Sequence, residues 1–143
     1  PVDSAVRGQA DNALADRIEH DGIPSFVEYW ENIPLFESQK RLPAEIRQRV
    51  RDQRLKNEPH GLANSLRGFG AGEMPSLWGN LNQISIPTLI LAGELDTKYV
   101  TIAHEMSARI KNARVEIVSD SGHTIHLEQP LRFQEIISSF LGL

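Results

Sequence analysis

The chain of 143 residues carries 15 lysines and arginines against 19 aspartates and glutamates, a formal charge of −4, and 40% of its residues are hydrophobic. This composition suits one globular domain and offers no general attraction to nucleic acid or to an anionic membrane. The lack of cysteine excludes disulfides, thiolate metal sites and cysteine nucleophiles. We expect a cytoplasmic protein, because no secretory signal is visible and no apolar run approaches the roughly 20 residues that span a bilayer.

The chain up to about residue 80 is predicted to be helical. Apolar residues recur at helical spacing over residues 7–20, and Gly22 is placed to end that helix. A second, aromatic helix then starts near Pro24, which favours a first helical turn, and continues to a break at Pro34. This part of the chain therefore begins with two short helices separated at a glycine.

A third helix is predicted over residues 43–56, with a thin apolar stripe and more basic than acidic residues. This surface could attract an anionic ligand. A solvated helix face is the better interpretation, because a nucleic-acid site would add aromatic side chains. A fourth helix, residues 59–67, leads into the glycine-rich residues 68–72. A phosphate-binding loop would need a preceding strand and a following Lys-Ser/Thr, so we interpret this segment as a flexible link.

The second half of the chain alternates strands and helices. Residues 88–92 are a continuous apolar run, typical of a parallel strand that is covered on both faces, and residues 114–118 form a second strand. The order of elements predicts the α/β class with parallel strands. The helix boundaries are expected at the capping residues and prolines of this half, namely Thr97 or Thr101, Pro130 and Gly142.

Two parallel strands do not make a stable sheet, and no further strand pattern is found upstream. We therefore expect the sheet to be incomplete in this chain. Its open edge would pair with the missing N-terminal part of the same protein or with a second copy. No nucleic-acid or membrane partner is expected.

Two residues with catalytic potential follow the two strands. Asp96 comes after the first strand and His123 after the second, and functional side chains gather beyond the carboxyl ends of parallel strands. An aspartate that accepts a hydrogen bond from histidine Nδ1 fixes the tautomer and leaves Nε2 as a base toward a hydroxyl. Gly122 allows the tight backbone that presents the ring. We therefore predict that Asp96 and His123 form an acid–base pair.

Simpler interpretations exist for these residues and their neighbours. Asp96 could merely cap the following helix, and an isolated histidine is usually structural. His126 and Glu128 are expected to be local hydrogen-bonding partners. A metal site formed by His123, His126 and Glu128 has no recognised ligand spacing, so no metal is expected.

Several segments resemble the α/β-hydrolase superfamily. The matching motifs are PTLILAGELD, which ends at Asp96, and SGH, which ends at His123 and is followed by Glu128-Gln129-Pro130. In that superfamily the order is nucleophile, acid, histidine, often with a helical lid before the acid strand. The resemblance implies a helical lid over residues 1–80 and a C-terminal core segment of the α/β-hydrolase fold over residues 81–143.

A narrower resemblance covers most of the chain. Its motifs are similar to those of the 2-succinyl-6-hydroxy-2,4-cyclohexadiene-1-carboxylate synthases of menaquinone biosynthesis, namely YWENIPLF, GLANSLR, PSLW, GELDTKY and GHTIHLEQP. The resemblance implies a lyase without a cofactor that eliminates pyruvate from a carboxylated cyclohexene by a Ser-His-Asp triad. Arg67 would then bind a substrate carboxylate, and Trp30 would line the pocket. Without the resemblance, a helix-end cation and a core aromatic are the simpler interpretations of these two residues.

The nucleophile of such a triad is not found in the chain. No serine has glycine both two residues before it and two residues after it, so the G-x-S-x-G elbow is absent. We therefore expect a fragment of an enzyme whose serine lies outside this chain. The alternative enzyme is a carboxylic ester hydrolase of the same fold. The alternative of another class is a non-catalytic module that pairs through its open sheet edge.

Overall fold

The computed structural model describes residues 4–143, which form two compact units. The first unit contains the chain up to Ile33 together with Arg47–Ser76, and the second contains Pro34–Ile46 and Leu77–Leu143. Residues 1–3 of the expected lid lie outside the described residues. Pro34–Ile46 thus groups with the C-terminal residues, and the division into a lid over residues 1–80 and a core segment over residues 81–143 stays a prediction.

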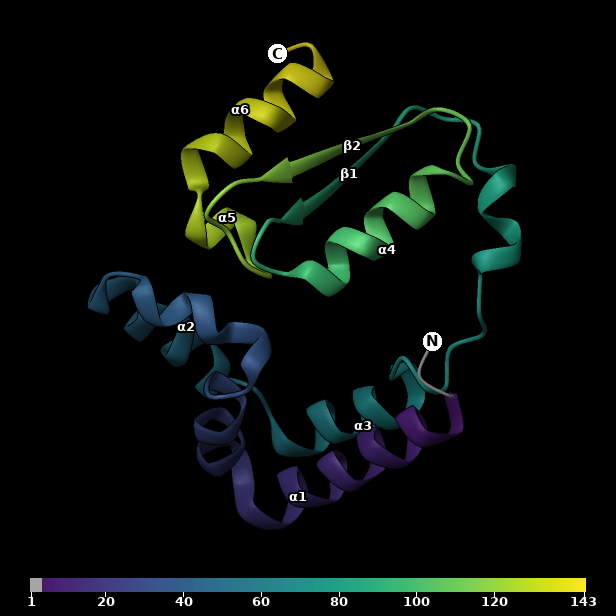
Figure 1. The fold of residues 1–143 in the computed structure, drawn as a ribbon. Coiled ribbons are helices and arrows are strands. Elements are labelled where there is room, and N and C mark those ends of the chain that lie inside the picture. Colours follow the sequence, from purple (N-terminus) through teal and green to yellow (C-terminus); the bar gives the residue numbers. More distant parts are fainter. Residues whose placement is uncertain (1–3) are drawn as a thin grey trace. The chain divides into compact units, whose positions relative to one another are not determined.

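The first unit is built on two helices, α1 (Ser4–Glu31) and α3 (Pro59–Phe69), which lie side by side and run in opposite directions (Figure 1). Their apolar positions recur at helical spacing and meet in a small core. The buried centre of that core and the partly buried side chains around it are Ile18, Ile23 and Val27, with Leu14, Phe26, Leu62 and Leu66.

Glycines shape this unit at two places. Gly22 has a φ of 79° and breaks α1 into two helical segments, so the expected helix break is confirmed. After α3, a Cβ on Gly72 would lie 2.2 Å from the backbone nitrogen of Gly8 in α1. Gly72 therefore permits close packing against α1, a role that the interpretation of this segment as a flexible link did not foresee.

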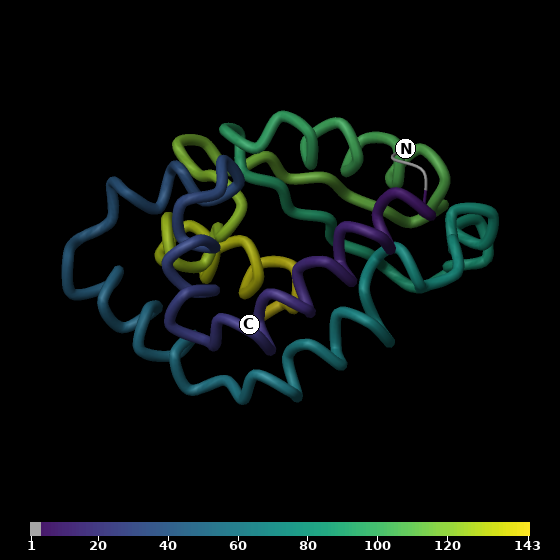
Figure 2. The backbone as a smooth tube through the Cα atoms, turned by 90° about the horizontal axis from the view of Figure 1, so that it is seen from below, coloured from purple at the N-terminus to yellow at the C-terminus, as the bar shows by residue number. Residues whose placement is uncertain are grey.

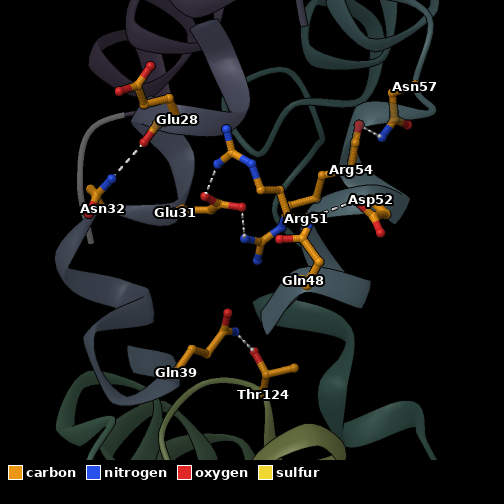
Figure 3. Close-up of polar contacts among 10 residues, drawn as sticks. All are labelled: Glu28, Glu31, Asn32, Gln39, Gln48, Arg51, Asp52, Arg54, Asn57 and Thr124. Carbon is orange, nitrogen blue, oxygen red and sulfur yellow. Dashed lines mark hydrogen bonds and ion pairs between the residues drawn. The ribbon is translucent and has the colours of Figure 1, made fainter. Parts of the chain in front are cut away.

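The basic helix α2 (Ala44–Leu55) buries none of its residues, as expected of a solvated helix. Glu31, at the end of α1, forms ion pairs with Arg51 and Arg54 of α2 (Figure 3). These pairs attach α2 to α1. Burial lowers the pKa of Arg54, and the charge of Glu31 opposes this effect. The excess of basic residues is therefore partly neutralised within the first unit.

The second unit contains a parallel pair of strands, β1 (Thr88–Gly93) and β2 (Ala113–Val118), in a register that sets Gly93 opposite Val118. The helices α4 (Thr97–Ser107) and α6 (Pro130–Leu141) lie on opposite sides of this pair, as Figures 1 and 2 both show. Gly142 closes α6 in a left-handed conformation, as predicted. The core on the α6 side contains Val118, Ile125, Ile136, Leu89, Leu91 and Phe133.

Three short elements of this unit were not predicted, because helical segments of four to eight residues are too short to show a clear hydrophobic periodicity. They are η1 (Pro34–Arg41), η2 (Trp78–Gln83) and α5 (Ile125–Glu128).

The sheet of residues 4–143 has only these two strands, so the predicted incomplete sheet is confirmed. The apolar run of β1 was expected to be covered on both faces. In this chain only Ala92 and Gly93 of the strand are buried, and the rest is half-buried. Among the described helices, none is both long and apolar enough to cross a membrane.

Candidate active site

The carboxyl ends of β1 and β2 lie next to each other and bring two loops together. The amide of Glu94 donates to the carbonyl of Val118 at 2.9 Å, and the amide of Leu95 donates to that of Ser121 at 2.9 Å. Because the strands are parallel, both end at the same edge of the sheet, and the loops that follow them start there. The residue after Leu95 is Asp96, and His123 follows two residues after Ser121.

These loops place His123 Nδ1 2.7 Å from Asp96 Oδ2, which is the predicted geometry of the pair. The Asp96 side chain is 10% exposed and the His123 side chain 32% exposed. An ionised aspartate can only accept, so Nδ1 carries the proton and Nε2 is left as a base. The geometry thus suits proton transfer to and from Nε2.

Asp96 also caps α4. Its Oδ1 accepts the backbone N–H of Tyr99 at 3.5 Å, while Oδ2 faces the histidine. The expectation that Thr97 or Thr101 caps this helix is therefore wrong, because the acid itself occupies the N-cap position. The two interpretations of Asp96 are compatible, since each uses a different oxygen of one carboxylate.

Aromatic rings enclose the imidazole. The ring of Tyr99 lies edge-on to that of His123 with centroids 4.7 Å apart, and the ring of Phe36 lies edge-on at 6.1 Å. Edge-to-face contacts of this kind are favourable and restrict how far the ring can turn. The imidazole is therefore held on its sides as well as through Nδ1.

Two glycines let the backbones approach. A Cβ on Gly93 would lie 2.1 Å from the carbonyl oxygen of Gly122, and a Cβ on Gly122 would lie 2.1 Å from Ser38 Oγ. Any side chain at Gly93 would thus push the loop between β2 and α5 (residues 119–124, the histidine loop) away from β1. At this point of the sheet only glycine permits the close approach.

The element η1 forms a wall of the site. A cavity of about 510 Å³ is lined by Asp96, Gly122 and His123, by Leu95, and by six residues of η1, which are Pro34, Leu35, Glu37, Ser38, Lys40 and Arg41. Gln39, which is buried, donates to Thr124 Oγ1 at 2.6 Å (Figure 3). Arg41 donates to Asp120 at 2.8 Å. This wall was not predicted from the sequence, since the only signal in η1 is the overlap of its first three residues with the YWENIPLF motif.

Arg67 lies in the first unit and is not among the residues that line this cavity. Its Nη2 donates to Glu19 at 2.6 Å and to Asp16 at 2.7 Å, both on α1. These hydrogen bonds raise the pKa of Arg67, and its bond to Glu19, followed by that of His60, lowers the pKa of Glu19. The substrate-binding role of Arg67 stays a prediction. A ligand carboxylate that bound Arg67 would have to displace the carboxylates of Asp16 and Glu19.

Trp30 also lies in the first unit and does not line the cavity. Its ring stacks on Phe26 with centroids 5.4 Å apart and an interplanar angle of 28°. Trp30 is half-buried beside Phe26, which packs against the core of the first unit. Its role in lining a substrate pocket stays a prediction.

Of the neighbours of His123, Glu128 is a local hydrogen-bonding partner, as expected, because its carboxylate accepts two backbone N–H groups of the histidine loop. His126 is exposed and its ring contacts that of Phe133, with centroids 6.0 Å apart. Across residues 4–143, no group of three or more His, Asp or Glu side chains is arranged to hold a metal ion.

No protein-family model matches the chain. The chain is similar to a curated relative, the putative 2-succinyl-6-hydroxy-2,4-cyclohexadiene-1-carboxylate synthase of Bacillus subtilis. The two are 50% identical over 131 residues, which are 92% of this chain and 48% of the relative. The solved structure of MenH from S. aureus superposes with a TM-score of 0.96 at 45% identity, covering 97% of this chain and 52% of the other.

An esterase from Thermogutta terrifontis superposes with a TM-score of 0.82 at 27% identity, covering 95% of this chain and 50% of the esterase. The chain spans about half the length of the synthases and the esterase that it matches. The chain therefore belongs to the α/β-hydrolase superfamily and corresponds to the C-terminal part of that fold.

Proposed function

We propose that the chain is the acid–base portion of a menaquinone-pathway synthase, a lyase of the α/β-hydrolase fold. In this proposal His123 is the general base, Asp96 orients it, and the nucleophilic serine lies outside residues 1–143. The observation that carries the proposal is the 2.7 Å contact between His123 Nδ1 and Asp96 Oδ2 at the edge of a cavity where two parallel strands end. The 50% identity to a synthase of this name supports the choice of reaction.

The proposed chemistry moves one proton at a time. Nε2 of His123 takes the proton of the serine hydroxyl, and the serine oxygen takes a proton from the substrate. The electron pair left on the substrate breaks the bond to the leaving group, which departs as the enolate of pyruvate and takes the proton back from the imidazolium. Asp96 stabilises the imidazolium that forms, because its carboxylate faces Nδ1–H. The donors that hold the developing negative charge would come from outside this chain.

The cavity wall offers cations for a substrate with several carboxylates. Lys40 pairs with Glu37 at 2.6 Å, and Arg41 pairs with Asp120 at 2.8 Å. All four side chains are at least 49% exposed. Exposed pairs of this kind contribute little stability, so a substrate carboxylate can replace the acidic partner at small cost. This supports a carboxylated small molecule as the ligand.

The test is an assay of the complete protein that contains this segment, with the carboxylated cyclohexene substrate and with a set of simple esters. We expect pyruvate release that His123→Ala abolishes, and no pyruvate release from residues 1–143 alone. Pyruvate release by residues 1–143 alone would contradict the proposal, because no serine of the chain has the elbow setting.

Ester hydrolysis is the second candidate, favoured by the structural match to the Thermogutta terrifontis esterase. It would use the same His123 and Asp96. Ester turnover without pyruvate release in the complete protein would establish this alternative. Equal loss of both activities in His123→Ala would show that one base serves both.

The candidate of another class is an interaction module that pairs through the open edge of β1. This edge is the better candidate of the two, because β2 carries Arg114 and Glu116, and charged side chains are typical of strands that remain at a sheet edge. The partner would be the remainder of the same protein or a second copy.

The expected cytoplasmic location stays a prediction.

A further inference from the structure

The carboxylate of Glu128 accepts hydrogen bonds from the backbone on both sides of His123. Glu128, the last residue of α5, accepts the backbone N–H of Gly122 through Oε2 at 2.8 Å and the backbone N–H of Thr124 through Oε1 at 3.2 Å. These two residues are the neighbours of His123 on either side. Both oxygens of one side chain are therefore used to hold the peptide groups that flank the proposed base.

The two N–H groups need this acceptor. They lie in the loop between β2 and α5, where neither a strand nor a helix supplies a carbonyl for them, and Gly122 is buried. A buried N–H without a partner costs about 1–3 kcal/mol, and bonds to an ionised acceptor are roughly twice as strong as neutral ones. Glu128 therefore determines where this stretch of backbone lies.

The position of the backbone determines the geometry of the pair. The imidazole must reach Asp96 Oδ2 at 2.7 Å while it stays between the rings of Tyr99 and Phe36. A second contact acts on the same loop, because Gln39 donates to the side chain of Thr124. Gln39 does not replace Glu128, since it leaves the two backbone N–H groups without an acceptor.

We propose that Glu128 is a positioning residue for His123, acting through the backbone N–H groups of Gly122 and Thr124. This inference rests on the proposed function of His123 as the base. The carboxylate is needed as such, because a glutamine in the same place can accept only one of the two N–H groups and turns its own NH₂ toward the other. The isosteric Glu128→Gln variant therefore separates the role of the charge and its second oxygen from simple packing.

The first arm of the test is spectroscopic and uses the complete protein that contains this segment. The Nδ1 proton of His123, in its hydrogen bond to Asp96, gives a far-downfield NMR resonance. We expect this resonance to be lost or shifted upfield in Glu128→Gln and Glu128→Ala while the far-UV spectrum is kept. Glu135→Gln is the matched control, because Glu135 is exposed on α6 and pairs with Arg132 of the same helix.

The second arm is kinetic. We expect kcat for pyruvate release to fall roughly 10-fold in Glu128→Gln and roughly 100-fold in Glu128→Ala, with KM unchanged, as is typical when the support of a catalytic group is removed. An unchanged resonance together with a kcat equal to that of Glu135→Gln would overturn the inference. If the unsubstituted protein releases no pyruvate, the proposed function fails, while the spectroscopic arm still decides whether Glu128 positions His123. Should Glu128→Ala fail to fold, the isosteric Gln variant carries the test alone.

Discussion

Asp96 serves two partners, one with each oxygen of its carboxylate. Oδ1 accepts the N–H of Tyr99 at the start of α4, and Oδ2 accepts Nδ1–H of His123. Because the helix start and the acid are the same residue, the position of the carboxylate is determined by the helix. The start of α4 therefore holds the carboxylate in place where it faces the imidazole.

Asp96→Asn tests the second of these contacts. An asparagine oxygen can still cap α4, but its NH₂ would face the histidine and favour the tautomer that carries its proton on Nε2. We expect kcat of the complete protein to fall by about 10⁴-fold, the size of effect seen when a triad aspartate is replaced in this way. Thermal unfolding should change little, because the cap remains.

Asp52→Asn is the control for this substitution, since Asp52 lies on the solvated face of α2 and accepts from Gln48 of the same helix. Its kcat should equal that of the unsubstituted protein. An Asp96→Asn variant that keeps full activity would show that Asp96 is only a helix cap.

Gly93 is the residue at which β1 meets the histidine loop. Gly93→Ala would place a methyl group 2.1 Å from the carbonyl oxygen of Gly122 and 2.4 Å from that of Ser121. Both obstacles are backbone atoms and cannot turn aside. We expect a loss of unfolding free energy of about 1–3 kcal/mol or more, measured by urea unfolding, together with loss of activity. Gly79→Ala, where a Cβ meets open space, should be nearly neutral.

At the scale of elements, a charged cluster joins α1 to α3. Arg67 of α3 bonds to Asp16 and Glu19 of α1, and His60 of α3 also bonds to Glu19. The hydrogen bonds from Arg67 and then His60 lower the pKa of Glu19. A carboxyl whose pKa is lower in the folded state stabilises the fold above its ordinary value and loses this contribution in acid.

The cluster therefore predicts a pH dependence of stability. As the pH falls through the ordinary glutamate value of 4.5 and then through the lowered value of Glu19, the melting temperature should decline. Arg67→Met should flatten this decline, and added salt should do the same because the pair is partly exposed. Arg132→Met is the control, since Arg132 pairs with Glu135 of its own helix.

The same Arg67→Met variant separates the two roles of this residue. If the melting temperatures of Arg67→Met and of the unsubstituted protein decline equally with falling pH, the structural role of Arg67 is contradicted. A rise in KM at neutral pH with an unchanged melting temperature would favour the substrate-binding role expected from the sequence resemblance.

At the scale of the whole molecule, the sheet is the incomplete part. The amides of Thr88 and Glu94 donate toward β2, so the alternation along a strand turns those of Leu89 and Leu91 away from it. The open edge of β1 thus presents unpaired donors on an apolar strand without a charged residue. Such an edge is prone to pair with another chain.

We therefore expect residues 1–143, prepared alone, to associate in a concentration-dependent way, measured by analytical ultracentrifugation. Hydrogen exchange at Leu89 and Leu91 should slow when the chain associates or when the rest of the protein is added. The amides of Ile90 and Ala92, which face β2, are the internal control and should change less. A monomer with unprotected Leu89 and Leu91 at all concentrations would contradict this use of the edge.

Much of the second unit could be predicted from the sequence. The strands at 88–92 and 114–118 and the last helix follow from local patterns of apolar residues, glycine and proline, which act over a few neighbouring positions. The pairing of Asp96 with His123 also follows, because parallel strands that are adjacent must leave the sheet at one edge. The incompleteness of the sheet could also be predicted, because the sequence shows only two strand patterns.

Other features were decided only by tertiary contacts. The capping role of Asp96 and the two bonds of Glu128 depend on where side chains point after the loops close, which no spacing rule describes. The wall formed by η1 joins residues 34–41 to the histidine loop more than 75 positions away, as the separation of 79 between Arg41 and Asp120 and of 85 between Gln39 and Thr124 shows. Local sequence determines the elements because their forces are local, whereas the site depends on contacts between distant segments that form only when the chain packs.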